Sequence, residues 1–241
     1  MGRWVQLMLW KIAQRFKPLL ASLYDRMGRP PVPNLEGDRD IEFSWVAANM
    51  AQGPGRALDF GCGTSWMGLL AARRGFEVTA VDLTQVSWAY EHSALRFAHA
   101  DVTELVMQPD SFDLIINCSS VEHVGLQGRY GVSEGHGDGD LEVMAVLRSL
   151  LKPGREMLLT IPVGRDRVFA PKHRIYGEER LPRLLDGWEV VKSEYWGKDG
   201  SNRWSACEES VALAREPLDH YYSLGLFVVR RPEQAPQPGA K

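Results

Sequence analysis

Residues 57–65 read Ala-Leu-Asp-Phe-Gly-Cys-Gly-Thr-Ser, a stretch in which a short apolar strand runs directly into two glycines. Glycines at such a turn let backbone N–H groups approach a bound ligand closely. A dinucleotide-binding turn needs a third glycine three residues after the second, and Trp66 occupies that position. Asp59 also lies two residues before the first glycine, where a carboxylate suits a ligand with an ammonium group. The turn therefore disfavours a dinucleotide and the oxidoreductases that use one.

Strands and helices alternate on the C-terminal side of this turn. We expect strands at residues 56–60, 77–81, 97–100, 112–117, 157–161, 188–195 and 224–229, and helices at residues 66–74, 85–95 and 141–151. Such alternation implies parallel crossover units. The predicted fold is therefore α/β, a Rossmann-like doubly wound and mostly parallel seven-stranded sheet with helices on both faces. Ligands of such sheets bind at the carboxyl ends of the strands.

Two further acids follow neighbouring strands of the predicted sheet. Asp82 comes at the end of the second strand, where a carboxylate commonly accepts both hydroxyls of a ribose. Asp101 follows the third strand, where a short acid can reach an exocyclic amine. Together with Asp59 they favour a ligand with a cationic amino group, a ribose and an adenine. The alternative role for Asp59 and Asp82 is to cap strand–helix turns.

The same residues resemble the ordered motifs of class I S-adenosylmethionine-dependent methyltransferases. Residues 57–64 resemble motif I, with Ser65 in place of its usual third glycine, and residues 81–83, 99–102, 112–115 and 150–154 match the later motifs. The resemblance covers roughly residues 40–230 and implies that S-adenosylmethionine is the cofactor. It implies that Asp59 helps to hold the amino group, Asp82 the ribose, and Asp101 with the Val102 backbone the adenine. The full set of expected cofactor contacts is Asp59, Phe60, Gly61, Cys62, Gly63, Asp82, Leu83, Asp101, Val102, Asn117 and Ser119.

The segment after the fourth strand should face the transferred methyl group. Residues 117–124 read Asn-Cys-Ser-Ser-Val-Glu-His-Val, so His123 is the expected general base and Glu122 orients it or binds a cation. The alternative is that both residues only anchor the loop. The pattern resembles small-molecule O-methyltransferases, including the ubiquinone-pathway type, which carries Glu-x-x-Glu-His and can use a divalent metal. Here Ser119 stands at the first glutamate position.

A glycine-rich segment then precedes the helix predicted at residues 141–151. Its His136, Asp138 and Asp140 are close enough in sequence to share Mg²⁺, a possible second cofactor. Asp140 has an alternative role as the cap of the helix that follows. His136 is also a reserve candidate for the catalytic base.

A polar insertion at residues 165–176 follows the fifth strand. It contains His173, the second reserve candidate for the base, and four cations, Arg165, Arg167, Lys172 and Arg174. We expect a substrate-facing lid that holds an anionic or polyhydroxyl acceptor. Residues 121–126 together with 173–177 resemble a little-characterised methyltransferase branch associated with glycan and nucleotide-sugar biosynthesis.

This second resemblance implies O-methylation of a hydroxyl on a sugar or glycan precursor in polysaccharide biosynthesis. One alternative is an O-methyltransferase of a quinone, a phenol or another small natural product. The alternative from another class is a non-catalytic accessory protein that binds S-adenosylmethionine. Lys+Arg 28 against Asp+Glu 31 gives a net charge of −3, and the lack of a basic surplus argues against nucleic acid as a partner.

The ends of the chain differ from the middle. Residues 1–35 read as an amphipathic helix and a Pro-rich linker, residues 36–230 as the methyltransferase domain, and residues 231–241 as a disordered tail. The helix either packs on the domain or lies with its basic face, within residues 1–29, on an anionic membrane. Three cysteines without a C-x-x-C pair favour a reducing compartment, so we expect a cytoplasmic protein, peripheral at the inner face of the membrane in the second case. The sequence gives no oligomeric state.

Overall fold

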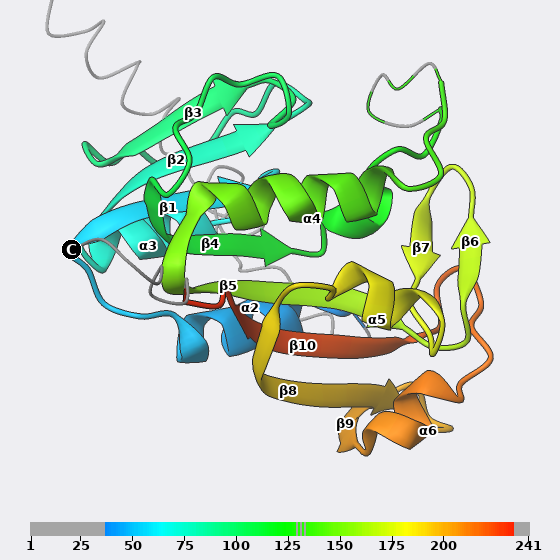
Figure 1. The fold of residues 1–241 in the computed structure, drawn as a ribbon. Helices are drawn as coiled ribbons and strands as arrows, with labels where there is room; N and C mark the ends of the chain where they lie inside the picture. The colour runs from blue at the N-terminus through cyan, green and yellow to red at the C-terminus, as the bar shows by residue number, and fades with distance from the viewer. Residues whose placement is uncertain (1–36, 129, 131, 133, 234–241) are drawn as a thin grey trace, which may run out of the picture. The chain divides into compact units, whose positions relative to one another are not determined.

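A computed structural model describes residues 37–128, 130, 132 and 134–233 of the 241-residue chain. Within these residues the main sheet has eight strands in the order β3-β2-β1-β4-β5-β10-β8-β9 (Figure 1). In chain order they are β1 (Gly55–Phe60), β2 (Phe76–Asp82), β3 (Leu95–His99), β4 (Phe112–Cys118), β5 (Leu151–Val163), β8 (Glu189–Lys198), β9 (Trp204–Cys207) and β10 (Ser223–Arg230). A separate hairpin consists of β6 (Arg167–Phe169) and β7 (His173–Ile175).

The strands from β3 to β5 pair in parallel, whereas β10 is antiparallel to both β5 and β8. The expected Rossmann-like, mostly parallel α/β sheet is thus confirmed. The described sheet has eight strands where seven were predicted, because the short edge strand β9 pairs antiparallel with β8. β9 was missed because its residues are only partly buried and show no apolar run.

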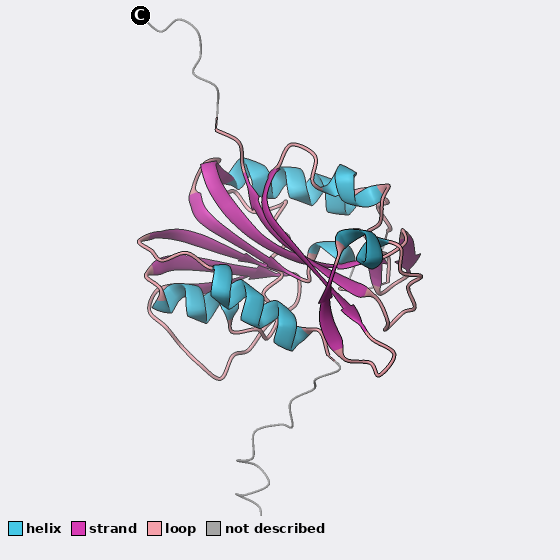
Figure 2. Ribbon diagram, turned by 90° about the horizontal axis from the view of Figure 1, so that it is seen from below, coloured by secondary structure: helices cyan, strands magenta, loops and turns pink. Residues whose placement is uncertain are grey.

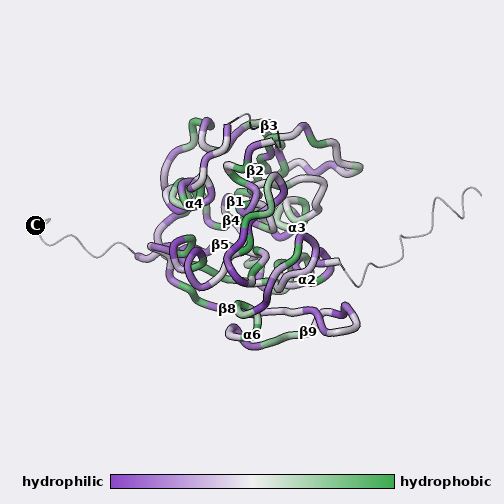
Figure 3. The backbone as a smooth tube through the Cα atoms, turned by 90° about the vertical axis from the view of Figure 1, so that its right-hand side faces the viewer, coloured by the Kyte–Doolittle hydropathy of each residue, from purple (hydrophilic) through white to green (hydrophobic). Residues whose placement is uncertain are grey.

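Helices cover both faces of the sheet (Figure 2). On one face lie α2 (Arg39–Asn49) and α3 (Met67–Arg73), and on the other lies α4 (Gly139–Leu150). Two short helices, α5 (Arg180–Leu184) and α6 (Glu209–Leu213), follow later in the chain. Strand side chains alternate between the two faces, so Leu114 and Ile116 pack with α2 and α3 while Ile115 packs with α4. Figure 3 shows hydrophobic stretches of the chain around β4, in the middle of the sheet.

The helix predicted at residues 85–95 is wrong, since the chain there is irregular and Leu95 already begins β3. Two aromatic side chains explain the difference. Trp88 Nε1 donates to the carbonyl of Gly63 at 3.0 Å, and the Tyr90 hydroxyl donates to the carbonyl of Ser65. Their rings stack with centroids 5.4 Å apart. The segment therefore braces the glycine turn from outside, which an amphipathic helix would not do.

Two expected regions fall wholly or partly outside the described residues. The helix and linker at residues 1–35 lie outside them, as do residues 234–241 of the expected tail. Arg231, also assigned to the tail, is anchored, because its guanidinium donates to the carbonyls of Arg148, Ser149 and Leu151. In the described part of the chain, every helix is too short or too polar to cross a bilayer.

Candidate functional site

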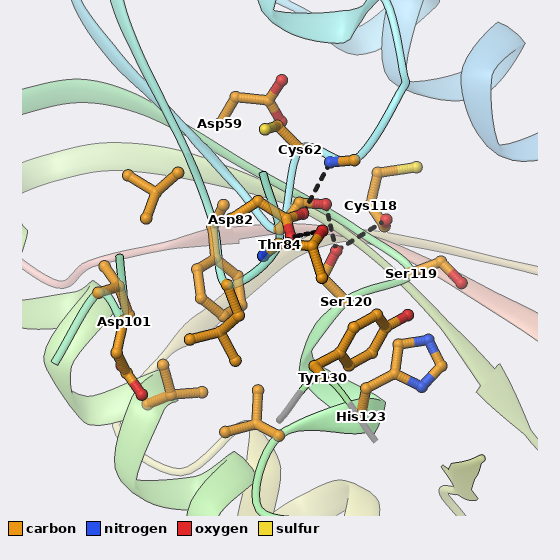
Figure 4. A pocket seen from close by; sticks show the side chains of 18 of the residues that line it. Asp59, Cys62, Asp82, Thr84, Asp101, Cys118, Ser119, Ser120, His123 and Tyr130 are labelled. Atoms are coloured by element: carbon orange, nitrogen blue, oxygen red, sulfur yellow. Dashed lines mark hydrogen bonds between the residues drawn. The ribbon is translucent and has the colours of Figure 1, made fainter. Parts of the chain in front are cut away.

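A cavity of about 630 Å³ opens at the carboxyl ends of β1, β2 and β4. This volume lies within the range of small-molecule sites. Figure 4 shows Asp101 at one end of the cavity and His123 with Tyr130 at the other. Most of the expected cofactor contacts line it: Asp59, Phe60, Gly61, Cys62, Gly63, Asp82, Leu83, Asp101, Val102 and Ser119.

The glycine turn after β1 has two glycines with different requirements. Both have positive φ, +63° at Gly61 and +47° at Gly63, a region that other residues adopt only with strain. A Cβ on Gly61 would lie 2.4 Å from Ser120 Oγ, whose hydroxyl donates to the Gly61 carbonyl at 3.0 Å. A Cβ on Gly63 would meet no atom of the described chain within 4 Å. Gly61 therefore packs against the segment after β4, while Gly63 leaves room for a ligand.

Asp82 lines the cavity and also braces the turn. Its Oδ2 accepts the N–H of Gly63 at 2.9 Å, and its Oδ1 accepts both the N–H and the hydroxyl of Thr84, at 2.8 and 2.6 Å. The capping role predicted as the alternative is thus present. It does not exclude ribose binding, because each carboxylate oxygen accepts more than one hydrogen bond.

Asp101 is held in the same manner after β3. Its Oδ1 accepts the N–H of Thr103 at 2.8 Å and the Thr103 hydroxyl at 2.7 Å. The side chain of Val102 beside it is buried and lines the cavity. Asp82 and Asp101 therefore present carboxylates from two neighbouring strands to the same space.

Asp59 is the most deeply buried of these acids, with 2% of its surface exposed. Among the described residues, no donor reaches its Oδ2 with the geometry of a hydrogen bond, although Asp59 lines the cavity. Burial raises the pKa of Asp59 to about 7, and the nearby N–H of Gly68 opposes this rise. A buried carboxyl with an unsatisfied oxygen beside an open glycine turn fits a ligand that brings an ammonium group.

The end of β4 leads into a tight turn that includes η1 (Val121–His123). Asn117 is not among the described residues that line the cavity, so its expected cofactor contact is not supported. Its side chain is fully buried, and its Oδ1 accepts the N–H of Val121 at 3.3 Å. Ser119 does line the cavity, and it adopts φ of +53°, a conformation that strained functional turns often contain.

Glu122 and His123 leave this turn in different directions. Glu122 is buried and is not among the described residues that line the cavity, and its Oε1 accepts the Ser119 hydroxyl at 2.6 Å. Burial raises its pKa to about 7. His123 lines the cavity, with Nδ1 2.6 Å from the carbonyl oxygen of Lys172 and Nε2 3.6 Å from Glu122 Oε1. A carbonyl only accepts, so Nδ1 carries a proton, and in the neutral imidazole Nε2 then carries the lone pair.

The two reserve histidines lie in unlike places. His136 lines the cavity, but its side chain is 58% exposed and lies 3.6 Å from Glu142. His173 is not among the described lining residues, and its ring packs between those of His123 and Tyr222, with centroids 6.4 and 5.4 Å away. The geometry therefore favours His123 over both.

Sequence comparisons show the family of the chain. The family described as "Caenorhabditis protein of unknown function, DUF268" matches residues 66–211, more than half of the chain. A ubiquinone biosynthesis O-methyltransferase of Xanthomonas campestris pv. campestris is 30% identical over 179 residues, covering 71% of this chain and 68% of that protein. The chain belongs to the DUF268 family and to the S-adenosylmethionine-dependent methyltransferases.

Solved structures agree with this methyltransferase in fold. A Burkholderia thailandensis 1,6-didemethyltoxoflavin-N1-methyltransferase, solved with S-adenosylhomocysteine, has a TM-score of 0.56 at 19% identity, covering 92% of this chain and 90% of that one. The cyclase SpnF has a TM-score of 0.59 at 17% identity, covering 92% and 96%. The same fold thus occurs in a protein named for another reaction, so the acceptor chemistry must be argued from the site.

The metal site expected from His136, Asp138 and Asp140 is not formed. Asp140 is fully buried and accepts two hydrogen bonds from Arg180, and Asp138 forms ion pairs with Arg180 and Arg183. The described residues contain no group of three His, Cys, Asp or Glu side chains that could hold a metal, so they do not fit Mg²⁺. Asp140 does not cap a helix either, since it lies inside α4. The guanidinium groups of Arg180 and Arg183, both on α5, pair with these carboxylates. The sequence around Asp138 and Asp140 does not reveal this pairing.

The cationic lid expected at residues 165–176 is also wrong, because none of its four cations is among the described residues that line the cavity. Arg165 and Arg167 pair with Glu216, and Lys172 pairs with Asp219. Arg174 is buried. The insertion therefore directs its charges to neighbouring segments of the chain.

Helix α2, which was not predicted from the sequence, adds two residues to the cavity wall, Arg39 and Phe43. Arg39 forms an ion pair with Glu42, which is fully buried and accepts the Thr160 hydroxyl at 2.7 Å. Burial raises the pKa of Glu42 to about 7. The available signal was Asp38 followed by apolar residues at helical spacing after the Pro-rich segment.

Gly61→Ala is expected to disrupt this methyltransferase at the glycine turn. The new Cβ meets Ser120 at 2.4 Å, and φ of +63° strains an alanine. Together these effects should lower the free energy of unfolding by about 2–4 kcal/mol and weaken S-adenosylmethionine binding at least about tenfold. Urea unfolding and calorimetry measure both. The double variant Gly61→Ala/Ser120→Gly removes the clash and should recover part of both losses, whereas an unperturbed single variant contradicts the close packing.

Asp59 should make cofactor binding depend on pH. We expect the ionised carboxylate to pair with the ammonium group of the cofactor, whereas the free protein holds Asp59 partly protonated because its pKa is about 7. Binding then releases a proton, so affinity should fall by up to about tenfold per unit as pH drops from 7 to 5.5. Calorimetry in buffers of different ionisation enthalpy detects the released proton. Asp59→Asn should bind more weakly with a flatter pH profile, and an unchanged profile excludes Asp59 as the titrating group.

Proposed function

We propose that this methyltransferase transfers a methyl group to a hydroxyl oxygen of a small phenol- or quinol-type acceptor. The observation that carries the proposal is the orientation of His123, which lines the cavity while the Lys172 carbonyl holds its Nδ1–H. Nε2 is then the nitrogen that can take a proton from an acceptor hydroxyl. Among the aromatic side chains that line the cavity, Phe43 and Tyr130 suit a ring-shaped acceptor.

The chain's own groups divide the work of the reaction. S-Adenosylmethionine supplies a methyl group activated on a sulfonium sulfur. Asp59, Asp82 and Asp101 are proposed to hold its amino group, ribose and adenine, as their places around the cavity allow. His123 takes the proton of the acceptor hydroxyl at Nε2, and the Glu122 carboxylate, 3.6 Å away, stabilises the imidazolium that results. The cavity is formed by backbone turns that hold these groups before any ligand enters.

A sugar or glycan precursor is the second candidate acceptor. Glu134, His136 and Glu142 line the cavity, and carboxylates and imidazoles can hydrogen-bond sugar hydroxyls. The name of the Xanthomonas campestris relative favours the phenolic acceptor, since it refers to ubiquinone biosynthesis.

Methyl transfer to three probes separates these possibilities. The purified chain is incubated with methyl-labelled S-adenosylmethionine and either 4-methylcatechol, methyl α-D-glucopyranoside or aniline. We expect label in the catechol, and labelling about 10²–10⁴-fold slower with His123→Ala. Label in the glucoside supports the sugar acceptor instead, and label in aniline contradicts O-methylation. Binding of S-adenosylmethionine without label in any probe contradicts the proposal and favours the accessory protein.

A further inference from the structure

The segment that follows His123 is closed at its base by contacts between Gly125 and His136. We call this pair of residues the neck. The N–H of His136 donates to the carbonyl of Gly125 at 2.8 Å, and a Cβ on Gly125 would lie 2.4 Å from the His136 carbonyl oxygen. Tyr130, Val132 and Glu134, which lie between these two residues in the sequence, line the cavity. The position of this wall therefore depends on how the neck is held.

One buried guanidinium holds both sides of the neck. Arg174, on β7, is 1% exposed. Its Nη1 donates to the carbonyls of Glu122 and Val124, on one side of the neck, and its Nη2 donates to those of His136 and Gly137, on the other side, at 3.3 and 3.2 Å. A planar guanidinium suits such a junction because its N–H groups point in fixed and different directions.

Asp140 makes the burial of this charge possible. Its carboxylate lies 3.7 Å from Arg174 Nε, and it also accepts the Tyr176 hydroxyl at 3.0 Å and Arg180 Nε at 2.9 Å. An unpaired charge at this depth would be strongly destabilising, so the pair is needed for Arg174 to reach the carbonyls. This arrangement accounts for the buried Asp140 that the metal hypothesis left without a role.

The same short segment also orients the proposed base. The carbonyl of Lys172, two residues before Arg174, accepts the Nδ1–H of His123. Residues 172–174 thus hold the imidazole at one point and the turn that carries it at another. Arg174 is not among the described residues that line the cavity, so it acts on the reaction through His123 and the wall.

We propose that Arg174 is a positioning residue that closes the neck and sets His123 for proton transfer; the inference rests on the proposed O-methyltransferase function. In this proposal, the insertion at residues 165–176 serves to hold the turn that carries His123. A displacement of about 1 Å at a reacting group can cost about 10²-fold in rate, so a loosened neck should act on turnover more than on cofactor binding.

Arg174→Met and Arg174→Lys test this proposal, with Arg167→Met as the matched control, since Arg167 is an exposed arginine of the same hairpin. Arg174→Met should lower kcat with 4-methylcatechol about 10²-fold while the Kd for S-adenosylmethionine changes less than about threefold. Lysine keeps the charge beside Asp140, but one ammonium cannot bind carbonyls on both sides of the neck. Arg174→Lys should therefore regain thermal stability without regaining kcat. Arg167→Met should match the wild type.

Hydrogen exchange tests whether Arg174 holds the neck, and this test does not depend on any acceptor. The amides of His136 and Gly139, hydrogen-bonded across and after the neck, should exchange at least about tenfold faster in both Arg174 variants, while those of Leu114 and Ile116 in β4 stay unchanged. An Arg174→Lys variant with wild-type kcat and wild-type exchange overturns the proposal. If the wild type does not methylate 4-methylcatechol, the phenolic acceptor fails, and the exchange rates alone decide whether Arg174 holds the neck.

Discussion

His123→Ala is expected to lower kcat for methyl transfer by about 10²–10⁴-fold, the usual contribution of a general base. The imidazole lines the cavity with its Nδ1–H on the Lys172 carbonyl, so its removal leaves no nitrogen at that place to take the acceptor proton. The affinity for S-adenosylmethionine should change little, because the proposed cofactor contacts come from β1, β2 and β3. Single-turnover assays at saturating cofactor measure the rate, and calorimetry measures the affinity.

The controls for this prediction are chemical and positional. His123→Gln keeps a polar side chain but not the ability to take a proton, so it should be nearly as inactive as His123→Ala. The wild-type rate should rise with pH, since only the unprotonated imidazole can act as a base. His136→Ala should retain most of its activity because that side chain is largely exposed. If His136→Ala or His173→Ala is inactive while His123→Ala is active, the base lies on another loop.

Asp82→Ala is expected to weaken S-adenosylmethionine binding by about 30- to 900-fold. The carboxylate is proposed to accept the two ribose hydroxyls, and hydrogen bonds to a charged group are worth about 1.5–3 kcal/mol each, which gives roughly 2–4 kcal/mol after partial replacement by water. The variant also loses the bond from Asp82 to the Gly63 N–H, so the glycine turn loosens at the same time. Calorimetry on folded protein measures the loss.

Thr84→Val is the matched control for Asp82. It removes the hydroxyl that donates to Asp82 Oδ1 but keeps the carboxylate at the cavity. Its affinity for S-adenosylmethionine should stay within about threefold of the wild type, because the turn keeps its backbone hydrogen bonds. Unchanged affinity in Asp82→Ala would exclude the ribose contact, and an equal loss in both variants would assign the effect to the turn.

The fold was predictable because its strands are locally distinct. β4 lies in the middle of the sheet with both faces covered, so it contains the consecutive apolar residues Leu114, Ile115 and Ile116, which local composition detects directly. The edge strand β9 has no such requirement and left no signal. The helix prediction at residues 85–95 was wrong for a related reason, since Trp88 and Tyr90 make their hydrogen bonds to the distant glycine turn.

The cofactor end of the cavity follows from short stretches of sequence. Asp59, Asp82 and Asp101 each come at or just after the end of a parallel strand, and neighbouring strands bring such positions together without help from distant residues. The conformation of the glycine turn likewise depends on its own two glycines and the adjoining strands, although Trp88 and Tyr90 also brace it from outside. This end of the site was therefore determined by local sequence and strand order.

The acceptor end was decided by tertiary structure. Neighbouring residues in the sequence led to the prediction of a metal site at Asp140 and of a lid at Arg174. The structure instead brings both residues into one cluster with Arg180, which lies forty residues after Asp140. Arg39 reaches the cavity from a helix that packs against β4 and β5. A buried charge takes whatever partner the fold brings to it, because desolvation makes an unpaired charge too costly. Sequence spacing alone cannot show that partner when it comes from another element.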